Sequence, residues 1–189
     1  MRELSLHILD IAENSVSAGG SRVEVSVIEE TVNDRLSIVI SDNGKGMDAE
    51  TVSRVLDPFV TSRTTRKVGL GLPLLKAAAE GCNGELTIES EPGVGTTVQV
   101  SFQHSHIDRM PLGDLAETWL TLLLGSPEVN WVFYYQVDDA IFFIDDLELK
   151  RELEGISITE PGVIRIIREL IRDGIDSVSK KAKEHTCLP

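Results

Sequence analysis

Apolar and polar side chains alternate one by one in four short stretches of the chain before residue 104. A period of two places every second side chain on the same face of a strand, so each stretch predicts a strand with one buried and one polar face. We therefore expect an antiparallel or mixed sheet with a core on one side. The apolar positions are Val23, Val25 and Val27; Leu36, Ile38 and Ile40; Leu86 and Ile88; and Val98, Val100 and Phe102.

Apolar residues at helical spacing flank these stretches. Leu4, Ile8 and Ile11 lie three to four residues apart, and a Gly-Gly pair follows as a stop signal. Asp48 can cap a second helix. The predicted helices cover residues 4–18, 49–56 and 72–81. Because these helices can cover only one face of the sheet, we expect an α+β two-layer sandwich with the helices on one face.

The composition changes near residue 105, after which most of the aromatic residues occur. Seven of the nine aromatic residues lie between positions 119 and 143. A helix, a hairpin turning at Asp138-Asp139, and a second helix are predicted over residues 113–125, 131–144 and 161–173. The neighbouring pair Asp145-Asp146 is interpreted as a solvated strand end rather than a metal site. The predicted units are a domain of residues 1–104, a small α-β-β-α C-terminal annex of residues 105–176, and a flexible tail of residues 177–189.

Charge and cysteine content narrow the range of partners and compartments. The net charge of −13 argues against a nucleic-acid partner, which would need a basic face. No apolar run approaches the roughly 20 residues of a membrane span, and the N-terminus does not resemble a secretory signal. Cys82 and Cys187 are expected to be reduced thiols, as in a cytoplasmic protein. In this acidic chain the cluster Arg63, Arg66 and Lys67 is a candidate anion site, although a solvated loop gives the same pattern.

The segment Asp42-Asn43-Gly44-Lys45-Gly46 follows a predicted buried strand. A carboxylate only accepts hydrogen bonds, so Asp42 suits an exocyclic amine such as that of adenine. Gly44 and Gly46 allow the backbone to approach a flat ring closely. The same letters also predict an ordinary tight turn.

Asp10 and Asn14 lie four positions apart and therefore share one face of the first predicted helix. The amide oxygen of Asn14 could ligate Mg²⁺, and Asp10 could deprotonate a water or an acceptor hydroxyl. A solvated helix face explains the pair equally. Further on, Gly69 and Gly71 open a helix whose N-terminus could bind an anion, and Thr97 could support Asp42 through its hydroxyl group.

The order and spacing of these motifs resemble the GHKL superfamily, which includes gyrase B subunits, a heat-shock chaperone, histidine kinases and MutL. The resemblance covers about residues 4–103 and is that of a stand-alone histidine-kinase-like ATPase with a C-terminal annex. The matching motifs are Glu13-Asn14-Ser15 with Ala18-Gly19, Asp42 to Met47, Asp57-Pro58-Phe59 with Thr61 and Arg63, Gly69 to Leu72, and Gly95-Thr96-Thr97.

The resemblance implies a Bergerat-type site for ATP and Mg²⁺. Asn14 would carry the Mg²⁺, Asp42 would bind the adenine amine, and residues 58–68 would form a mobile lid. Asp10 stands where the hydrolysing branch of the family has glutamate, and it is the candidate general base. The implied ATP-binding residues are Asn14, Asp42, Gly44, Gly46, Met47, Phe59, Arg63, Arg66, Lys67, Gly69, Leu70, Gly71, Leu72 and Thr97.

Three functions follow as alternatives. The chain could transfer or hydrolyse the γ-phosphate as a kinase-like signalling enzyme, could bind ATP without turnover and so control a partner surface, or could be a serine protein kinase of the anti-sigma type. An unknown protein partner or acceptor is expected in each case. The annex aromatics predict a core or an interface, and a homodimer stays open.

His106 is a candidate phosphoacceptor, because Ser105-His106-Ile107-Asp108-Arg109-Met110-Pro111-Leu112 partly resembles the phosphoacceptor box of histidine kinases. Ile107 replaces the acid that normally follows the histidine, and the segment follows the ATPase motifs instead of preceding them. We therefore favour a linker between the last sheet strand and the annex.

Overall fold

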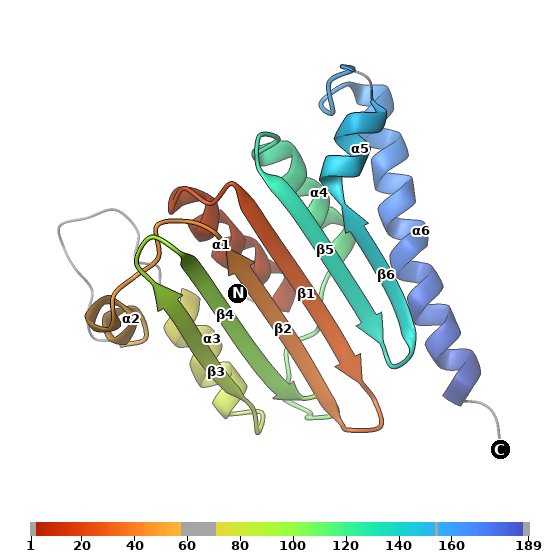
Figure 1. Cartoon of the computed structure of the whole chain (residues 1–189). Coiled ribbons are helices and arrows are strands. Elements are labelled where there is room, and N and C mark those ends of the chain that lie inside the picture. Colours follow the sequence, from red (N-terminus) through yellow and green to blue (C-terminus); the bar gives the residue numbers. More distant parts are fainter. Residues whose placement is uncertain (1–2, 58–70, 154, 187–189) are drawn as a thin grey trace.

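The computed structural model describes residues 3–57, 71–153 and 155–186 and shows one sheet with helices on one of its faces (Figure 1). The strands are β1 (Arg22–Glu30), β2 (Arg35–Asp42), β3 (Glu85–Glu91), β4 (Gly95–Gln103), β5 (Asn130–Val137) and β6 (Ala140–Asp145). The helices are α1 (Leu4–Ser17), α2 (Ala49–Val55), α3 (Gly71–Glu80), α4 (Leu115–Gly125), α5 (Asp146–Glu152) and α6 (Pro161–Thr186).

The six strands lie in the order β3-β4-β2-β1-β5-β6. All neighbouring pairs are antiparallel except β1 and β5, which are parallel. The register sets Val25 opposite Ile40 and Ile40 opposite Val98, so the predicted inward positions of three strands meet on one face. The prediction of a mixed sheet in an α+β two-layer sandwich is confirmed.

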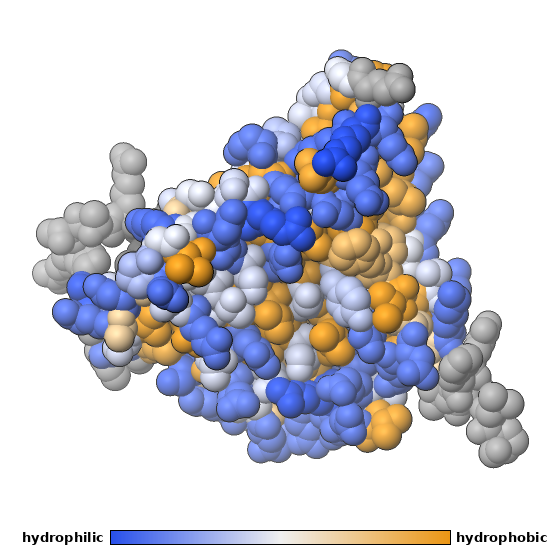
Figure 2. Space-filling model, in the orientation of Figure 1, coloured by the Kyte–Doolittle hydropathy of each residue, from blue (hydrophilic) through white to orange (hydrophobic). Residues whose placement is uncertain are grey.

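Helices α1 and α3 cover the left half of the sheet in Figure 1, and α4 and α6 cover the right half. The apolar stripe of α1 supplies Leu4, Ile8 and Ile11 to the core, each no more than 5% exposed. The opposite face of the sheet carries Ser37, Ser41, Gln99 and other polar side chains between scattered apolar ones, and it faces the viewer in Figure 2. The alternation in the sequence therefore specified which face is covered.

Residues 105–153 and 155–186 extend the sheet of the first half of the chain rather than packing as a separate layer. Strand β5 pairs with β1 along its whole length, and Trp131 and Phe133 join the same apolar core as Val23 and Val25. The core-facing side chains of the hairpin, such as Phe133, are buried, whereas Ile141 and Phe143 on its other face are 55% and 57% exposed. The boundary at residue 104 stays a prediction about domains, but the two parts share one sheet.

The turn after β6 differs from its prediction. Asp146 is fully buried and begins α5, a helix that the sequence pattern did not predict. Its Oδ1 accepts hydrogen bonds from the Trp131 N–H and from the Asn130 side-chain amide, each at 2.9 Å, and its Oδ2 lies 2.6 Å from the Lys150 ammonium. A buried carboxylate needs such partners, so Asp146 connects α5 to the start of β5 instead of standing in solvent.

The C-terminal segment also differs from its prediction. Helix α6 continues to Thr186, well beyond the predicted end at residue 173, and includes part of the segment 177–189 that was expected to be a flexible tail. Val178 is only 1% exposed. Its burial supplies the packing that extends the helix.

Candidate functional site

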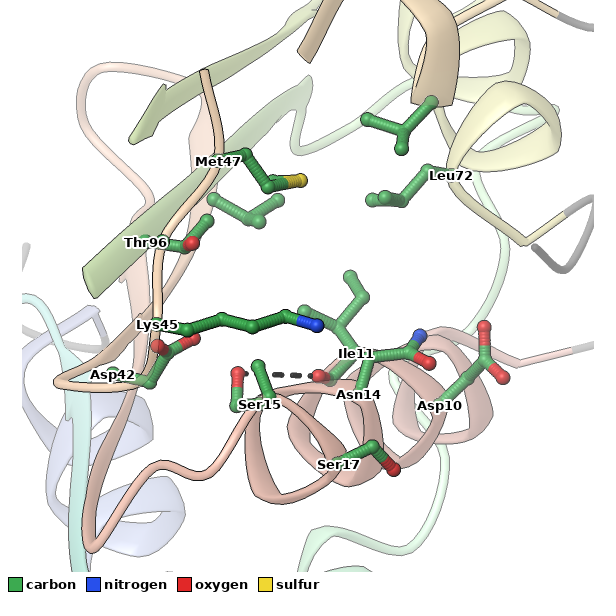
Figure 3. Close-up of a pocket in the computed structure, with 14 residues that line it drawn as sticks. Asp10, Ile11, Asn14, Ser15, Ser17, Asp42, Lys45, Met47, Leu72 and Thr96 are labelled. Carbon is green, nitrogen blue, oxygen red and sulfur yellow. Dashed lines mark hydrogen bonds between the residues drawn. The ribbon is translucent and has the colours of Figure 1, made fainter. Parts of the chain in front are cut away.

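A cavity of about 290 Å³ opens between α1, the segment after β2, the start of β4, and helices α2 and α3 (Figure 3). Helix α1 forms one wall and the segment after Asp42 forms the other. The cavity is lined by Asp10, Ile11, Asn14, Ser15, Ser17, Ala18, Asp42, Lys45, Gly46, Met47, Val55, Leu72, Thr96 and Val98. It therefore combines an apolar interior with a few convergent polar groups, as small-molecule sites do.

Helix α1 aims Asp10 and Asn14 at the cavity because the two residues are one helical turn apart. Asn14 is exposed and Asp10 is half-buried, so both can meet a solvated ligand. Ile11 lies between them in sequence and faces the same cavity, and its carbonyl oxygen accepts a hydrogen bond from the Ser15 hydroxyl at 3.3 Å. The wall is a regular helix, which fixes the spacing of its functional groups.

The turn after β2 is held by Asn43, which leaves Asp42 available to the cavity. The Asn43 Oδ1 accepts hydrogen bonds from the backbone N–H groups of Ser21 and Arg22, at 2.8 and 2.9 Å. The Asp42 Oδ1 accepts one from the Gly44 N–H at 2.8 Å. The Oδ2 of Asp42 has no hydrogen-bond donor among residues 3–57, 71–153 and 155–186. Asn43 therefore makes the predicted tight turn, and Asp42 lines the cavity.

Two glycines let this turn lie directly against the β3–β4 hairpin. Gly46 has a positive φ of 65°, and a Cβ there would overlap the carbonyl oxygen of Glu91. Gly95 has a φ of 144°, and a Cβ there would overlap the carbonyl oxygen of Asp42. Both positions therefore require glycine for close backbone approach. Gly44 packs against Ala18 and Asp42 behind the cavity wall rather than lining it.

Ser90 joins the turn to the sheet. Its hydroxyl accepts a hydrogen bond from the Met47 N–H at 2.7 Å and lies 2.9 Å from the Thr96 hydroxyl. The Ser90 hydroxyl also donates to the Gly95 carbonyl oxygen at 3.0 Å. Met47 and Thr96 are therefore held on the same side of the cavity.

The predicted hydrogen bond between Thr97 and Asp42 is wrong, and Thr96 is the residue opposite Asp42 in the sheet. Asp42 pairs with Thr96 in the β2–β4 register, whereas Thr97 pairs with Ser41 and lies 2.9 Å from it, hydroxyl to hydroxyl. Successive strand residues point to opposite faces, so Thr97 belongs to the uncovered face of the sheet. The alternation Val98, Val100, Phe102 contained this signal, because even-numbered positions of β4 face the core.

Comparison with known proteins supplies the family. The family of histidine kinase-, DNA gyrase B- and HSP90-like ATPases matches residues 2–106, more than half of the chain. The chain belongs to this family. The matched region contains both walls of the cavity, so the predicted GHKL ATP-binding domain is confirmed.

The GHKL domain has relatives among curated sensor kinases. It is 32% identical over 94 residues to the sensor histidine kinase YvrG of Bacillus subtilis, and the alignment covers 48% of this chain and 16% of YvrG. It is 40% identical over 89 residues to the sensor protein kinase FleS of Pseudomonas aeruginosa, covering 47% of this chain and 22% of that protein. The chain thus spans only a small part of these relatives.

A solved structure shows the same fold. The MutL ATPase domain of Aquifex aeolicus, determined with ADP, aligns with a TM-score of 0.51 at 18% identity. The alignment covers 82% of this chain and 68% of the MutL domain, which is a larger share of this chain than the family match alone. In the part of the chain that the structure describes, no helix is both long and apolar enough to cross a membrane.

The structure brings six of the predicted site residues together at the cavity of the GHKL domain: Asp10, Asn14, Asp42, Gly46, Met47 and Leu72. Gly71 is buried at the first position of α3, beside Leu72. The predicted residues Phe59, Arg63, Arg66, Lys67, Gly69 and Leu70 lie outside the described residues. The structure therefore describes the adenine and metal ends of the predicted site, but not the predicted lid.

Two histidines lie apart from the cavity. His106 lies beyond the end of β4 that is opposite to Thr96. Its ring Nδ1 accepts a hydrogen bond from the Asp108 N–H at 3.2 Å, within a turn that leads towards α4. His7 is 4% exposed on the core side of α1, and burial lowers the pKa of its imidazole. The proposed role of His106 as phosphoacceptor stays a prediction.

Lys45 and Thr96 are site residues that the sequence analysis did not select. Lys45 stood inside a quoted motif, but its own side chain had no assigned role. Its long side chain enters the cavity from the Asp42 wall (Figure 3). Apolar residues such as Val55 and Val98 complete the walls, and their spacing alone could not separate them from the core.

The register of β4 leads us to expect different effects on nucleotide binding from replacing Thr96 and from replacing Thr97. We expect Thr96→Val to weaken ADP binding about tenfold, because it removes a hydroxyl group from the cavity. Thr97→Val should leave ADP binding within about twofold of the wild type. Both variants keep a β-branched strand residue, so each controls for the other. Isothermal titration calorimetry measures both affinities, and a larger loss in Thr97→Val would contradict the assigned faces.

Proposed function

We propose that the chain binds Mg-ATP in this cavity and transfers or hydrolyses the γ-phosphate as a kinase-like signalling protein. One observation carries the proposal. Asp42 and Asn14 line the same cavity from opposite walls, one at the end of a strand and the other on a helix. This arrangement suits a ligand with an amine at one end and a metal-bound phosphate chain at the other. The family match to ATPases supports the nucleotide as that ligand.

The donor set of α1 fits Mg²⁺. Mg²⁺ prefers oxygen ligands, keeps several of its waters and needs few protein groups. Asn14 offers an exposed amide oxygen at the cavity, and Asp10 offers a carboxylate one turn away. Asn14 would therefore hold the metal, and Asp10 would hold one of its waters. When bound, Mg²⁺ would supply charge neutralisation at the phosphates.

Asp10 is the described group best placed to move a proton. Phosphoryl transfer depends mainly on positioning and on charge neutralisation, with one residue orienting or deprotonating the nucleophile. The carboxylate of Asp10 reaches the cavity from the same wall as Asn14. It could accept the proton of a water or of an acceptor hydroxyl group. Asp42, by contrast, is committed to the opposite wall.

Turnover is tested by replacing Asp10. We expect Asp10→Asn to reduce phosphate release or phosphoryl transfer by about 100-fold or more, while ATP affinity changes by less than about threefold. The measurement is incubation with γ-labelled ATP, followed by separation of free phosphate, labelled chain and labelled protein from cell extract. Glu13→Gln is the matched control, since Glu13 is an exposed acid on the same helix that does not line the cavity.

The outcomes separate the candidate functions. Label on a serine of another protein favours the anti-sigma type of kinase, and free phosphate favours an ATPase. If the wild type binds ATP but releases no label, with or without extract, the chain is a non-hydrolysing module whose bound ATP controls a partner surface. Asp10 has a shorter side chain than the glutamate of hydrolysing relatives, which is the observation that favours this second candidate. We propose that the unknown protein partner binds to the annex.

A further inference from the structure

Lys45 is anchored at the cavity wall by backbone contacts on both sides. Its N–H donates to the carbonyl oxygen of Ala18 at 3.0 Å, at the end of α1. Its carbonyl oxygen accepts a hydrogen bond from the Gly93 N–H at 2.8 Å, in the turn between β3 and β4. The backbone of Lys45 is therefore fixed between two elements of the fold, and its side chain is exposed.

The Lys45 side chain crosses the cavity in Figure 3. It extends from the wall that carries Asp42 towards the helix that carries Ile11 and Asn14. The ammonium group thus lies between the carboxylate assigned to adenine and the amide assigned to the metal. A nucleotide that spans these two groups must pass beside Lys45.

The charges of the side chains that line the cavity indicate which kind of ligand Lys45 could bind. Asp10 and Asp42 give the cavity two carboxylates, and Lys45 is the only cationic side chain among its described lining residues. No carboxylate of the described chain lies within 4 Å of the Lys45 ammonium, so this charge is not committed to an ion pair. An unpaired cation beside two acids lowers the electrostatic cost of admitting an anionic ligand.

We propose that Lys45 binds the phosphate nearest the ribose and so makes the site prefer 5′-phosphorylated nucleotides over adenosine. The inference rests on the proposed function, because it takes adenine at Asp42 and the metal at Asn14. The groups between these ends are the ribose and the first phosphate, which AMP, ADP and ATP have in common. Lys45 therefore acts on the whole nucleotide series and needs no contribution from residues 58–70.

The experiment compares AMP, ADP and adenosine in the presence of EDTA, so that no metal contributes. We expect Lys45→Met to weaken AMP and ADP binding about tenfold each, which is the size of one charge-assisted contact. Adenosine binding should change by less than about twofold, and Lys45→Arg should keep most of the affinity for ADP. Calorimetry suits ADP, and NMR chemical-shift titration suits the weaker ligands.

Lys76→Met is the control, because it removes the same charge from α3, where Lys76 lies 3.9 Å from Glu80 and does not line the cavity. It should bind all three ligands as the wild type does. Unchanged ADP affinity in Lys45→Met would overturn the inference, and so would an equal loss for adenosine, since that loss would place Lys45 on the base or on the fold of the turn. A wild type that binds none of the three ligands in EDTA and also fails to bind ATP with Mg²⁺ would refute the proposed function itself.

Discussion

Replacing Asp42 with asparagine is expected to weaken ATP binding roughly 100-fold or more. The Oδ1 of asparagine can still accept the hydrogen bond from the Gly44 N–H, so the turn should keep its shape. The second carboxylate oxygen, however, becomes an NH₂ group. A donor then faces the donor of the adenine amine, and this end of the site loses an acceptor. Calorimetry with ATP and Mg²⁺ measures the loss.

Asp139→Asn is the matched control for this prediction. Asp139 is an exposed acid in the β5–β6 turn, so its replacement removes the same charge far from the cavity. Its ATP affinity should equal that of the wild type, and thermal unfolding should show that Asp42→Asn stays folded. A folded Asp42→Asn variant with wild-type affinity would mean that Asp42 does not bind the base.

Replacing Asn14 with alanine should abolish the contribution of Mg²⁺ to ATP binding. Loss of a group that supports a metal site typically costs 10- to 100-fold, so loss of a direct ligand should cost at least about tenfold. We expect the affinity of Asn14→Ala for ATP to be the same with Mg²⁺ as with EDTA. Alanine is a better helix former than asparagine and Asn14 is exposed, so α1 should remain intact.

The comparison of two conditions makes the Asn14 prediction specific to the metal. In EDTA the variant and the wild type should bind ATP alike, because the amide is then only one weak contact among several. Asn33→Ala, which removes an exposed amide from the turn after β1, serves as control and should keep the full effect of Mg²⁺. If Asn14→Ala responds to Mg²⁺ as strongly as the wild type, the metal lies elsewhere.

The local structure of the first part of the chain, residues 1–104, was predictable because its sequence signals are local. The alternation of Val23, Val25 and Val27 specifies a strand face, and the spacing of Asp10 and Asn14 specifies a helix face. The glycines in the turn after Asp42 indicate a positive φ or a close backbone approach, because glycine adopts both without steric cost. Each of these signals acts within a few residues, so the sequence is sufficient to predict the local structure. The grouping of these residues around one cavity was implied by the family resemblance.

The second half was less predictable because its structure depends on contacts distant in sequence. The pairing of β5 with β1 joins residues more than 100 positions apart, and no local pattern specifies that neighbour. Asp146 has the sequence context of a solvated acid, yet Trp131 and Asn130 supply its buried partners. Helix α6 extends past its predicted end because Val178 finds a place in the core.

Two errors within the site have different causes. Thr97 was selected over Thr96 although the alternation of β4 already assigned the faces, so the information was present in the sequence. Lys45 is different, because a lysine between two glycines predicts only a solvated turn. Its position in the cavity follows from the contacts of its backbone with Ala18 and Gly93, which the sequence does not reveal.

A crystal structure of the chain with a non-hydrolysable ATP analogue and Mg²⁺ tests the central claim most directly. The account predicts the adenine amine within hydrogen-bond distance of an Asp42 carboxylate oxygen, and Mg²⁺ bound to the Asn14 amide oxygen and the phosphates. A nucleotide bound elsewhere, or bound in this cavity with its base turned away from Asp42 and its metal away from Asn14, would contradict the account.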